Sequence, residues 1–97
     1  METLQAIHTR RSVRAWTDEP VSDEHLETLL RAAMQAPSSE NSQPWHFVIV
    51  RDKSRLQAVG DLNKDALMAP KAKLGILVCA ELALERSKGW WMQDCSA

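Results

Sequence analysis

Three arginines occur within five residues near the N-terminus, in the segment Arg10–Arg14. A guanidinium group donates paired hydrogen bonds to phosphate oxygens, and the hydroxyl of Ser12 can donate to the same anion. Because a junction between a helix and a loop also offers free backbone N–H groups, the segment predicts a phosphate-binding site. Two other interpretations stay open, a solvated basic surface and an accidental match to the acceptor site of a basophilic protein kinase.

A second polar segment, Pro37–Pro44, is rich in serine and amide side chains. These hydroxyl and amide groups can both donate and accept hydrogen bonds, and a proline restricts the backbone at each end. Such a segment suits the hydrogen-bonding edge of a planar heterocycle. Taken alone, it is more typical of an ordinary helix-to-strand connection, in which serine and asparagine satisfy loop backbone groups.

Considered together, the two segments are more specific. The sequence resembles the N-terminal half of the FMN-dependent nitroreductase family in three successive segments: Arg10–Arg14, the loop Pro37–Trp45 and the apolar run His46–Val50. The resemblance implies an α+β fold with helices around a small antiparallel sheet, and it covers residues 1–97. The ending Trp90–Ala97 is similar to the opening of the long central helix of that family, so we expect a chain truncated relative to the family.

The resemblance also implies an activity, an NAD(P)H oxidoreductase that works as a homodimer with FMN sites built across the subunit interface. Hydride from NAD(P)H would reduce the flavin, and a fixed cation such as Arg14 would stabilise the negative charge around N1 and O2. A nitroaromatic or quinone would then accept the electrons. No catalytic acid or base is demanded of the protein.

The cofactor-binding residues implied by the resemblance fall into two groups. In one subunit, Arg10 and Arg11 would contact the phosphate, and Ser12 would contact the phosphate and the ribityl chain. Arg14 of the same subunit would contact the pyrimidine edge of the flavin. The other subunit would line the isoalloxazine and its dimethylbenzene side with Pro37, Ser38, Ser39 and Asn41.

Two other functions are weighed against this one. The missing half of the family's pattern motivates a truncated, non-catalytic relative that acts as a ligand-binding or assembly module. A nucleotide or nucleic-acid binder could use the three arginines. However, the net charge of −1 and the single phenylalanine argue against a nucleic-acid surface.

Length and composition limit what the chain can be. Its 97 residues, 44% hydrophobic, suffice for one small core, and a folded chain of this size should expose roughly 5,600 Å². Uncovered apolar helix faces predict an oligomer, domain-swapped or intertwined, and the resemblance implies a homodimer. Cys79 and Cys95 have neither disulfide-scaffold nor zinc spacing, and the three histidines are scattered, so we expect no metal and a reducing, cytoplasmic setting. No apolar run is long enough for a membrane span.

Apolar spacing and breakers predict the elements that must position these groups. The helix with the clearest period runs to Met34, with Ser22 as its N-cap and Pro37 beyond its end. The remaining predicted elements are helices over Thr3–Thr9, Ser54–Met68 and from Gly89 onward, and strands over Trp45–Val50 and Leu74–Ala80, the second of them buried.

Overall fold

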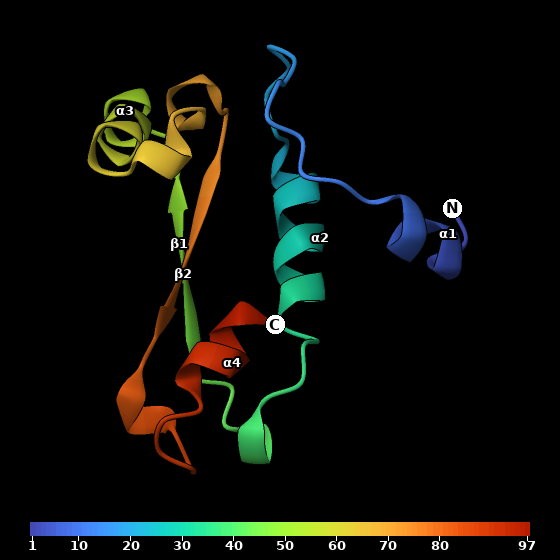
Figure 1. Cartoon of the computed structure of the whole chain (residues 1–97), viewed down its shortest axis with the longest axis vertical. Coiled ribbons are helices and arrows are strands. Elements are labelled where there is room, and N and C mark those ends of the chain that lie inside the picture. The colour runs from blue at the N-terminus through green and yellow to red at the C-terminus, as the bar shows by residue number, and fades with distance from the viewer.

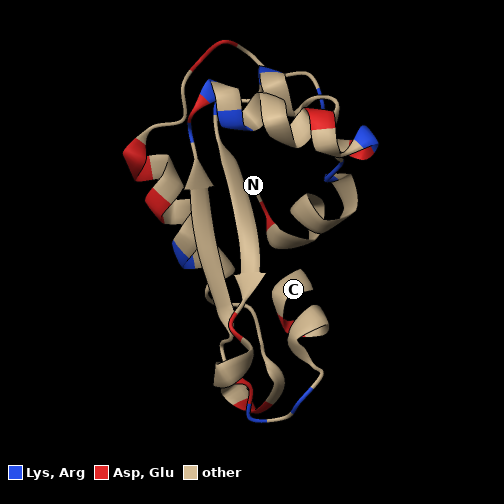
Figure 2. Ribbon diagram, turned by 90° about the vertical axis from the view of Figure 1, so that its left-hand side faces the viewer, with Lys and Arg blue, Asp and Glu red and all other residues tan.

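Two six-residue apolar runs form the strands of the molecule, β1 (Trp45–Val50) and β2 (Gly75–Ala80). In the computed structural model, which describes residues 1–97, they pair antiparallel, with Trp45 opposite Ala80 and Val50 opposite Gly75. Neither strand contains Lys, Arg, Asp or Glu, whereas the helices and connections around them do (Figure 2). The sheet and its surrounding helices confirm the predicted α+β fold.

Two helices precede the sheet, α1 (Thr3–Thr9) and α2 (Asp23–Ala33). The predicted N-cap of α2 is confirmed, because the Ser22 hydroxyl accepts a hydrogen bond from the backbone N–H of His25 at 3.1 Å. Figure 1 shows α1 standing apart from the rest of the molecule at one side. No helix of the molecule combines the length and the apolar character needed to cross a membrane.

The predicted helix over Ser54–Met68 is too long. Helix α3 covers Lys53–Leu62, because Asn63 adopts an extended conformation (φ −132°, ψ 110°) and its side chain accepts from the backbone N–H of Asp65 at 2.9 Å. That local hydrogen bond replaces a helical one. Two short 3-10 turns follow, η2 (Lys64–Ala66) and η3 (Ala69–Lys71), and η3 packs against α3.

The last part of the chain returns to the sheet. A 3-10 turn, η4 (Leu82–Leu84), follows β2, and Gly89 then takes a left-handed conformation (φ 91°) ahead of helix α4 (Trp91–Ser96). Helix α4 packs against both strands at the end of the sheet opposite to α3 (Figure 1). The turn at Gly89 therefore returns α4 to the sheet.

The core of this chain is small. Trp45 (9% exposed) and Leu56 (4% exposed) are its only buried large apolar side chains. The expectation that β2 is buried is wrong, since Leu77 is 57% exposed and nothing in the chain covers that part of the sheet. The total accessible surface is 7989 Å², against roughly 5,600 Å² for a compact chain of this size. The radius of gyration, 15.2 Å, likewise exceeds the compact value of about 12.5 Å.

Candidate functional site

The predicted phosphate-binding segment is an extended connection between α1 and α2. Arg10 is the C-cap of α1, and residues 11–21 that follow it form no helix or strand. The side chains of Arg10, Arg11 and Arg14 are exposed and make no ion pair or hydrogen bond. These three guanidinium groups are therefore available to an anion from outside the chain.

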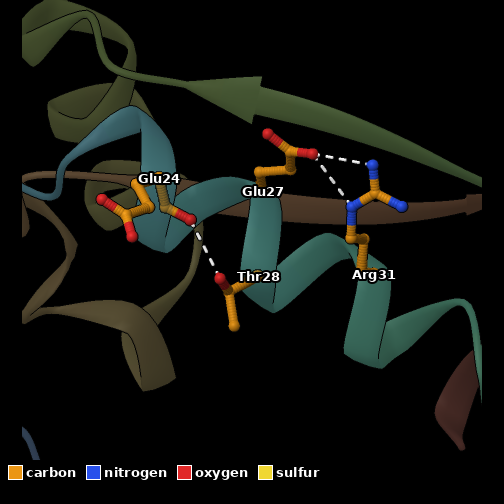
Figure 3. A network of polar contacts seen from close by, with 4 residues as sticks. All are labelled: Glu24, Glu27, Thr28 and Arg31. Atoms are coloured by element: carbon orange, nitrogen blue, oxygen red, sulfur yellow. Dashed lines mark hydrogen bonds and ion pairs between the residues drawn. The ribbon is translucent and has the colours of Figure 1, made fainter.

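The other four arginines are all engaged within the chain. On α2, the Nε of Arg31 donates to the carboxylate of Glu27 at 2.9 Å (Figure 3). On the same helix, the hydroxyl of Thr28 donates to the backbone carbonyl of Glu24. Arg51 pairs with Asp23, and Arg55 pairs with Asp52. Arg86 donates to the backbone carbonyl of Glu40. Lack of an internal acceptor thus separates the predicted trio from every other arginine.

Further donors lie on the same connection. The backbone N–H groups of residues 11–16 make no hydrogen bond, and the hydroxyl of Ser12 has no partner. Guanidinium, hydroxyl and backbone donors within a few residues match the several oxygens of a phosphate monoester. The residues present therefore fit the phosphate of FMN.

A hollow of about 1010 Å³ lies beside this connection. Ser12 and Arg14 line it together, and most of its wall is apolar, with Leu56 of α3 and Gly75 at the start of β2 among the lining residues. An exposed ion pair between Lys73 and Asp18 (3.5 Å) links the connection to the segment before β2. Since the wall is mostly apolar, the hollow suits uncharged groups, and neither Arg10 nor Arg11 lines it.

The loop Pro37–Pro44 has a defined and strained backbone. It contains a 3-10 turn, η1 (Ser39–Asn41), and three residues in the left-handed region: Glu40 (φ 51°), Asn41 (φ 53°) and Gln43 (φ 47°). Side chains with a Cβ adopt this region at a cost, so neighbouring contacts must hold it. One such contact is the Ser38 hydroxyl, which accepts from the backbone N–H of Gln43 at 3.0 Å.

Asp94 and Arg86, in the C-terminal part of the chain, also hold this loop, and neither is among the residues predicted from the sequence. The backbone N–H of Ser39 donates to Oδ1 of Asp94 on α4 at 2.8 Å. Arg86 donates from Nη1 to the carbonyl of Glu40 at 3.2 Å and from its backbone N–H to the hydroxyl of Ser42 at 3.0 Å. An acidic residue in the first turn of a short helix was the only available signal for Asp94, and Arg86 had none.

The loop also presents groups that the chain does not use. Pro37 and Asn41 are exposed, and the side chain of Asn41 makes no hydrogen bond. The hydroxyl of Ser39 is unpartnered as well, although its backbone is held. A ligand on this surface would meet one amide, one hydroxyl and an apolar ring.

The structure keeps the two predicted groups apart within one chain. In Figure 1 the connection after α1 meets α2 toward the upper end of that helix, whereas η1 lies beyond the lower end. The hollow that contains Ser12 and Arg14 includes no residue of the loop Pro37–Pro44. One copy of the chain therefore does not bring the two groups into a single binding site.

The thiol of Cys95, which follows Asp94 in the sequence, is not activated. Burial raises the pKa of Cys95 above its ordinary value of 9.0, and the nearby carboxylate of Asp94 adds to the effect. The sulfur donates to the backbone carbonyl of Cys79 at 3.8 Å. Because the thiolate is the nucleophilic form, Cys95 is unsuited to nucleophilic chemistry near neutral pH. No group of three or more His, Cys, Asp or Glu side chains is placed to hold a metal ion.

Comparison with known proteins gives consistent matches. The sequence model described as "Nitroreductase family" matches residues 7–94. A protein of Archaeoglobus fulgidus with the provisional name NADH dehydrogenase/NAD(P)H nitroreductase is 45% identical over an alignment of 97 positions. The alignment covers 99% of this chain and 56% of that protein. The chain spans about half the length of the curated relatives it matches.

Solved structures agree with the sequence comparison. An FMN-dependent nitroreductase of Clostridium difficile superposes with a TM-score of 0.86 at 29% identity, over 97% of this chain and 54% of that one. A provisionally named nitroreductase of Desulfovibrio desulfuricans, solved in complex with FMN, superposes with a TM-score of 0.87 at 35% identity, over 96% and 55%.

Proposed function

The chain belongs to the nitroreductase family, and on that premise we propose that residues 1–97 are the N-terminal half of an FMN-dependent NAD(P)H oxidoreductase domain. When bound, FMN would supply the redox chemistry between NAD(P)H and an electron acceptor, for which we propose nitroaromatics or quinones. The observation that carries the proposal is the trio Arg10, Arg11 and Arg14, which alone among the arginines have no acceptor in the chain.

Each proposed cofactor contact follows from the donors that a residue presents. Arg10 and Arg11 would hold the phosphate, and Ser12 would donate to the phosphate and the ribityl chain. Arg14, which borders the apolar hollow, would place a fixed positive charge at the pyrimidine edge of the flavin. A fixed cation there would stabilise the negative charge that the flavin gains on reduction.

The loop Pro37–Pro44 would complete the site from a second copy of the chain. Its exposed groups suit the ring system: Pro37 and Asn41 are free on the surface, and Ser38 and Ser39 lie between them. Because these residues lie apart from Arg10–Arg14 in one copy, we propose a homodimer in which each cofactor contacts both subunits.

The exposed surface supports such an assembly. The chain exposes about 2,400 Å² more than the scaling value for its size, an excess comparable to the area buried in large protein interfaces. Leu4 and Ile7 of α1 and Leu29 of α2 are each more than half exposed. Covering them with the same faces of a second copy would remove apolar area from water. The two free thiols favour a reducing compartment, and we propose the cytoplasm.

The test measures cofactor and turnover together. The purified chain is titrated with FMN, followed by the quenching of flavin fluorescence, and the oxidation of NAD(P)H is compared with that by the same concentration of free FMN. We expect saturable FMN binding and a rate of NAD(P)H oxidation above that of free flavin. Light scattering should give the mass of two chains.

Two outcomes contradict parts of the proposal. Saturable FMN binding with no NAD(P)H oxidation above the free-flavin rate would favour a non-catalytic module that binds ligand or assembles. A chain that does not bind FMN, or a stable monomer at micromolar concentration, would overturn the proposed cofactor site or the proposed dimer, respectively.

A further inference from the structure

The side chain of Asp94 is placed unusually for a charged residue. It is the only charged residue among the five buried residues of the chain, and it is 6% exposed. Burial of a carboxylate is unfavourable unless hydrogen-bond donors compensate it. The one donor that it receives comes from 55 residues away, the backbone N–H of Ser39 at 2.8 Å. The buried carboxylate therefore specifies where one residue of the distant loop must lie.

That loop needs external support. Glu40, Asn41 and Gln43 all have positive φ, so the backbone after Ser39 has a conformation that side chains with a Cβ disfavour. Ser39 is the residue immediately before this strained stretch and begins η1. A hydrogen bond that fixes its N–H consequently restrains the start of the turn that carries Asn41.

We propose that Asp94 is a positioning residue for the cofactor site. By holding the backbone of Ser39, it keeps the hydroxyl of that residue and the free amide of Asn41 in one arrangement. The loop is then already ordered when the flavin binds. This inference rests on the proposed function for its ligand. Preorganised loops bind more tightly because less conformational entropy is lost on binding.

The second oxygen of Asp94 makes the inference testable. Oδ2 is buried and has no hydrogen-bond partner within the chain. The position of the Ser39 backbone thus depends on one accepting oxygen of Asp94 and does not require the negative charge. Asp94→Asn keeps an accepting oxygen for the Ser39 N–H, whereas Asp94→Ala removes it.

A second pair of variants tests the same hydrogen bond from the loop side. Ser39→Pro deletes the N–H donor, and the extended conformation of Ser38 (ψ 156°) is one that a residue before proline favours. Ser39→Ala loses only the hydroxyl and is the matched control. Because Asp94 is unchanged in both variants, this pair keeps the test informative should Asp94→Ala fail to fold.

The experiment measures two quantities in the full chain: amide hydrogen exchange of the peptide that contains Ser39–Asn41, without FMN, and the dissociation constant for FMN. We expect exchange to become about tenfold faster and FMN binding about tenfold weaker in Asp94→Ala, with Asp94→Asn within about threefold of the wild type in both. Ser39→Pro should weaken FMN binding more than Ser39→Ala.

The outcomes separate this inference from the proposed function. Faster exchange with an unchanged FMN affinity would overturn the role of Asp94 in cofactor binding and leave the proposed function intact. Equal weakening by Asp94→Asn and Asp94→Ala would overturn positioning by the accepting oxygen. A wild-type chain that binds no FMN would overturn the proposed function and this inference with it.

Discussion

Gly60 of α3 lies so close to Pro70 of η3 that a Cβ on the glycine would be 2.8 Å from the Cδ atom of the proline. The backbone carbonyl of Ala66 would be 3.3 Å from the same Cβ. The glycine therefore permits the helix and the turn after it to pack together, although glycine lowers helix propensity. Two predictions follow from how α3 packs.

The first concerns Gly60→Ala. In an open helix this change stabilises by about 1 kcal/mol, because alanine has the higher helix propensity. Here the contact with Pro70 reverses the sign, and we expect the free energy of unfolding to fall by about 1–3 kcal/mol, as measured by urea denaturation. Gln57→Ala, on the exposed side of the same helix, is the control and should change it by less than about 0.5 kcal/mol. A more stable Gly60→Ala variant would show that the contact relaxes at no cost.

The second prediction compares two leucines of the same helix. Leu56 is 4% exposed and Leu62 is 88% exposed. Leu56→Ala should lower the free energy of unfolding by about 2–5 kcal/mol, because it leaves a cavity in a core that has one other large side chain. Leu62→Ala should change it by less than about 0.5 kcal/mol. Similar losses for both variants would indicate that Leu62 is covered in solution, as in an oligomer.

A third prediction concerns pH and the N-cap of α3. Asp52 accepts from the hydroxyl of Ser54 at 2.7 Å and from its backbone N–H at 2.8 Å, and these bonds lower the pKa of Asp52 below its ordinary value of 3.8. The folded state thus binds this proton less tightly than the unfolded state, and the contribution of Asp52 to stability is present above pH 3.8 and lost as pH falls through the folded pKa.

The measurement is the difference in unfolding free energy between the wild type and Asp52→Asn as a function of pH. We expect this difference to be constant near neutral pH and to decrease below pH 3.8. Asp61→Asn, on the exposed end of α3, serves as the control for a general loss of carboxylate charge. A difference that does not vary with pH would contradict the stabilising role of the ionised cap.

A fourth prediction isolates the phosphate ligands. Arg10→Ala combined with Arg11→Ala should weaken FMN binding by tenfold or more, because a hydrogen bond to a charged group contributes about 1.5–3 kcal/mol. Riboflavin, which lacks the phosphate, should bind the variant and the wild type alike. The control is Arg31→Ala combined with Arg55→Ala, which removes the same charge from arginines already paired in the chain. Equal losses for FMN and riboflavin would show that the two arginines do not contact the phosphate.

Much of the fold could be predicted from local sequence. The hydrophobic period and the Ser22 cap located α2, and the apolar run located β1 with its observed bounds. The end of α3 could not be predicted, because it depends on a side-chain hydrogen bond of Asn63 that competes with the helix. The exposure of Leu77 escaped prediction for another reason: an apolar run shows that a strand can be buried, and the rest of the chain decides whether it is.

The candidate site divides in the same way. The arginine cluster and the polar loop are contiguous in sequence, so residue type and spacing sufficed to propose them. The contact between Ser39 and Asp94 joins residues 55 positions apart, and no local pattern specifies it. That the three arginines lack internal acceptors also depends on where every carboxylate lies, which only the folded structure shows.

The two strands pair with each other alone, so each has one edge whose backbone N–H and C=O groups face no neighbouring strand. Neither strand carries the proline or charged residues that commonly protect such edges. An extended apolar segment of another chain could pair with such an edge through backbone hydrogen bonds. Handled by itself at high concentration, this polypeptide is consequently an aggregation hazard, and any partner that occupies those edges would also act as its solubility factor.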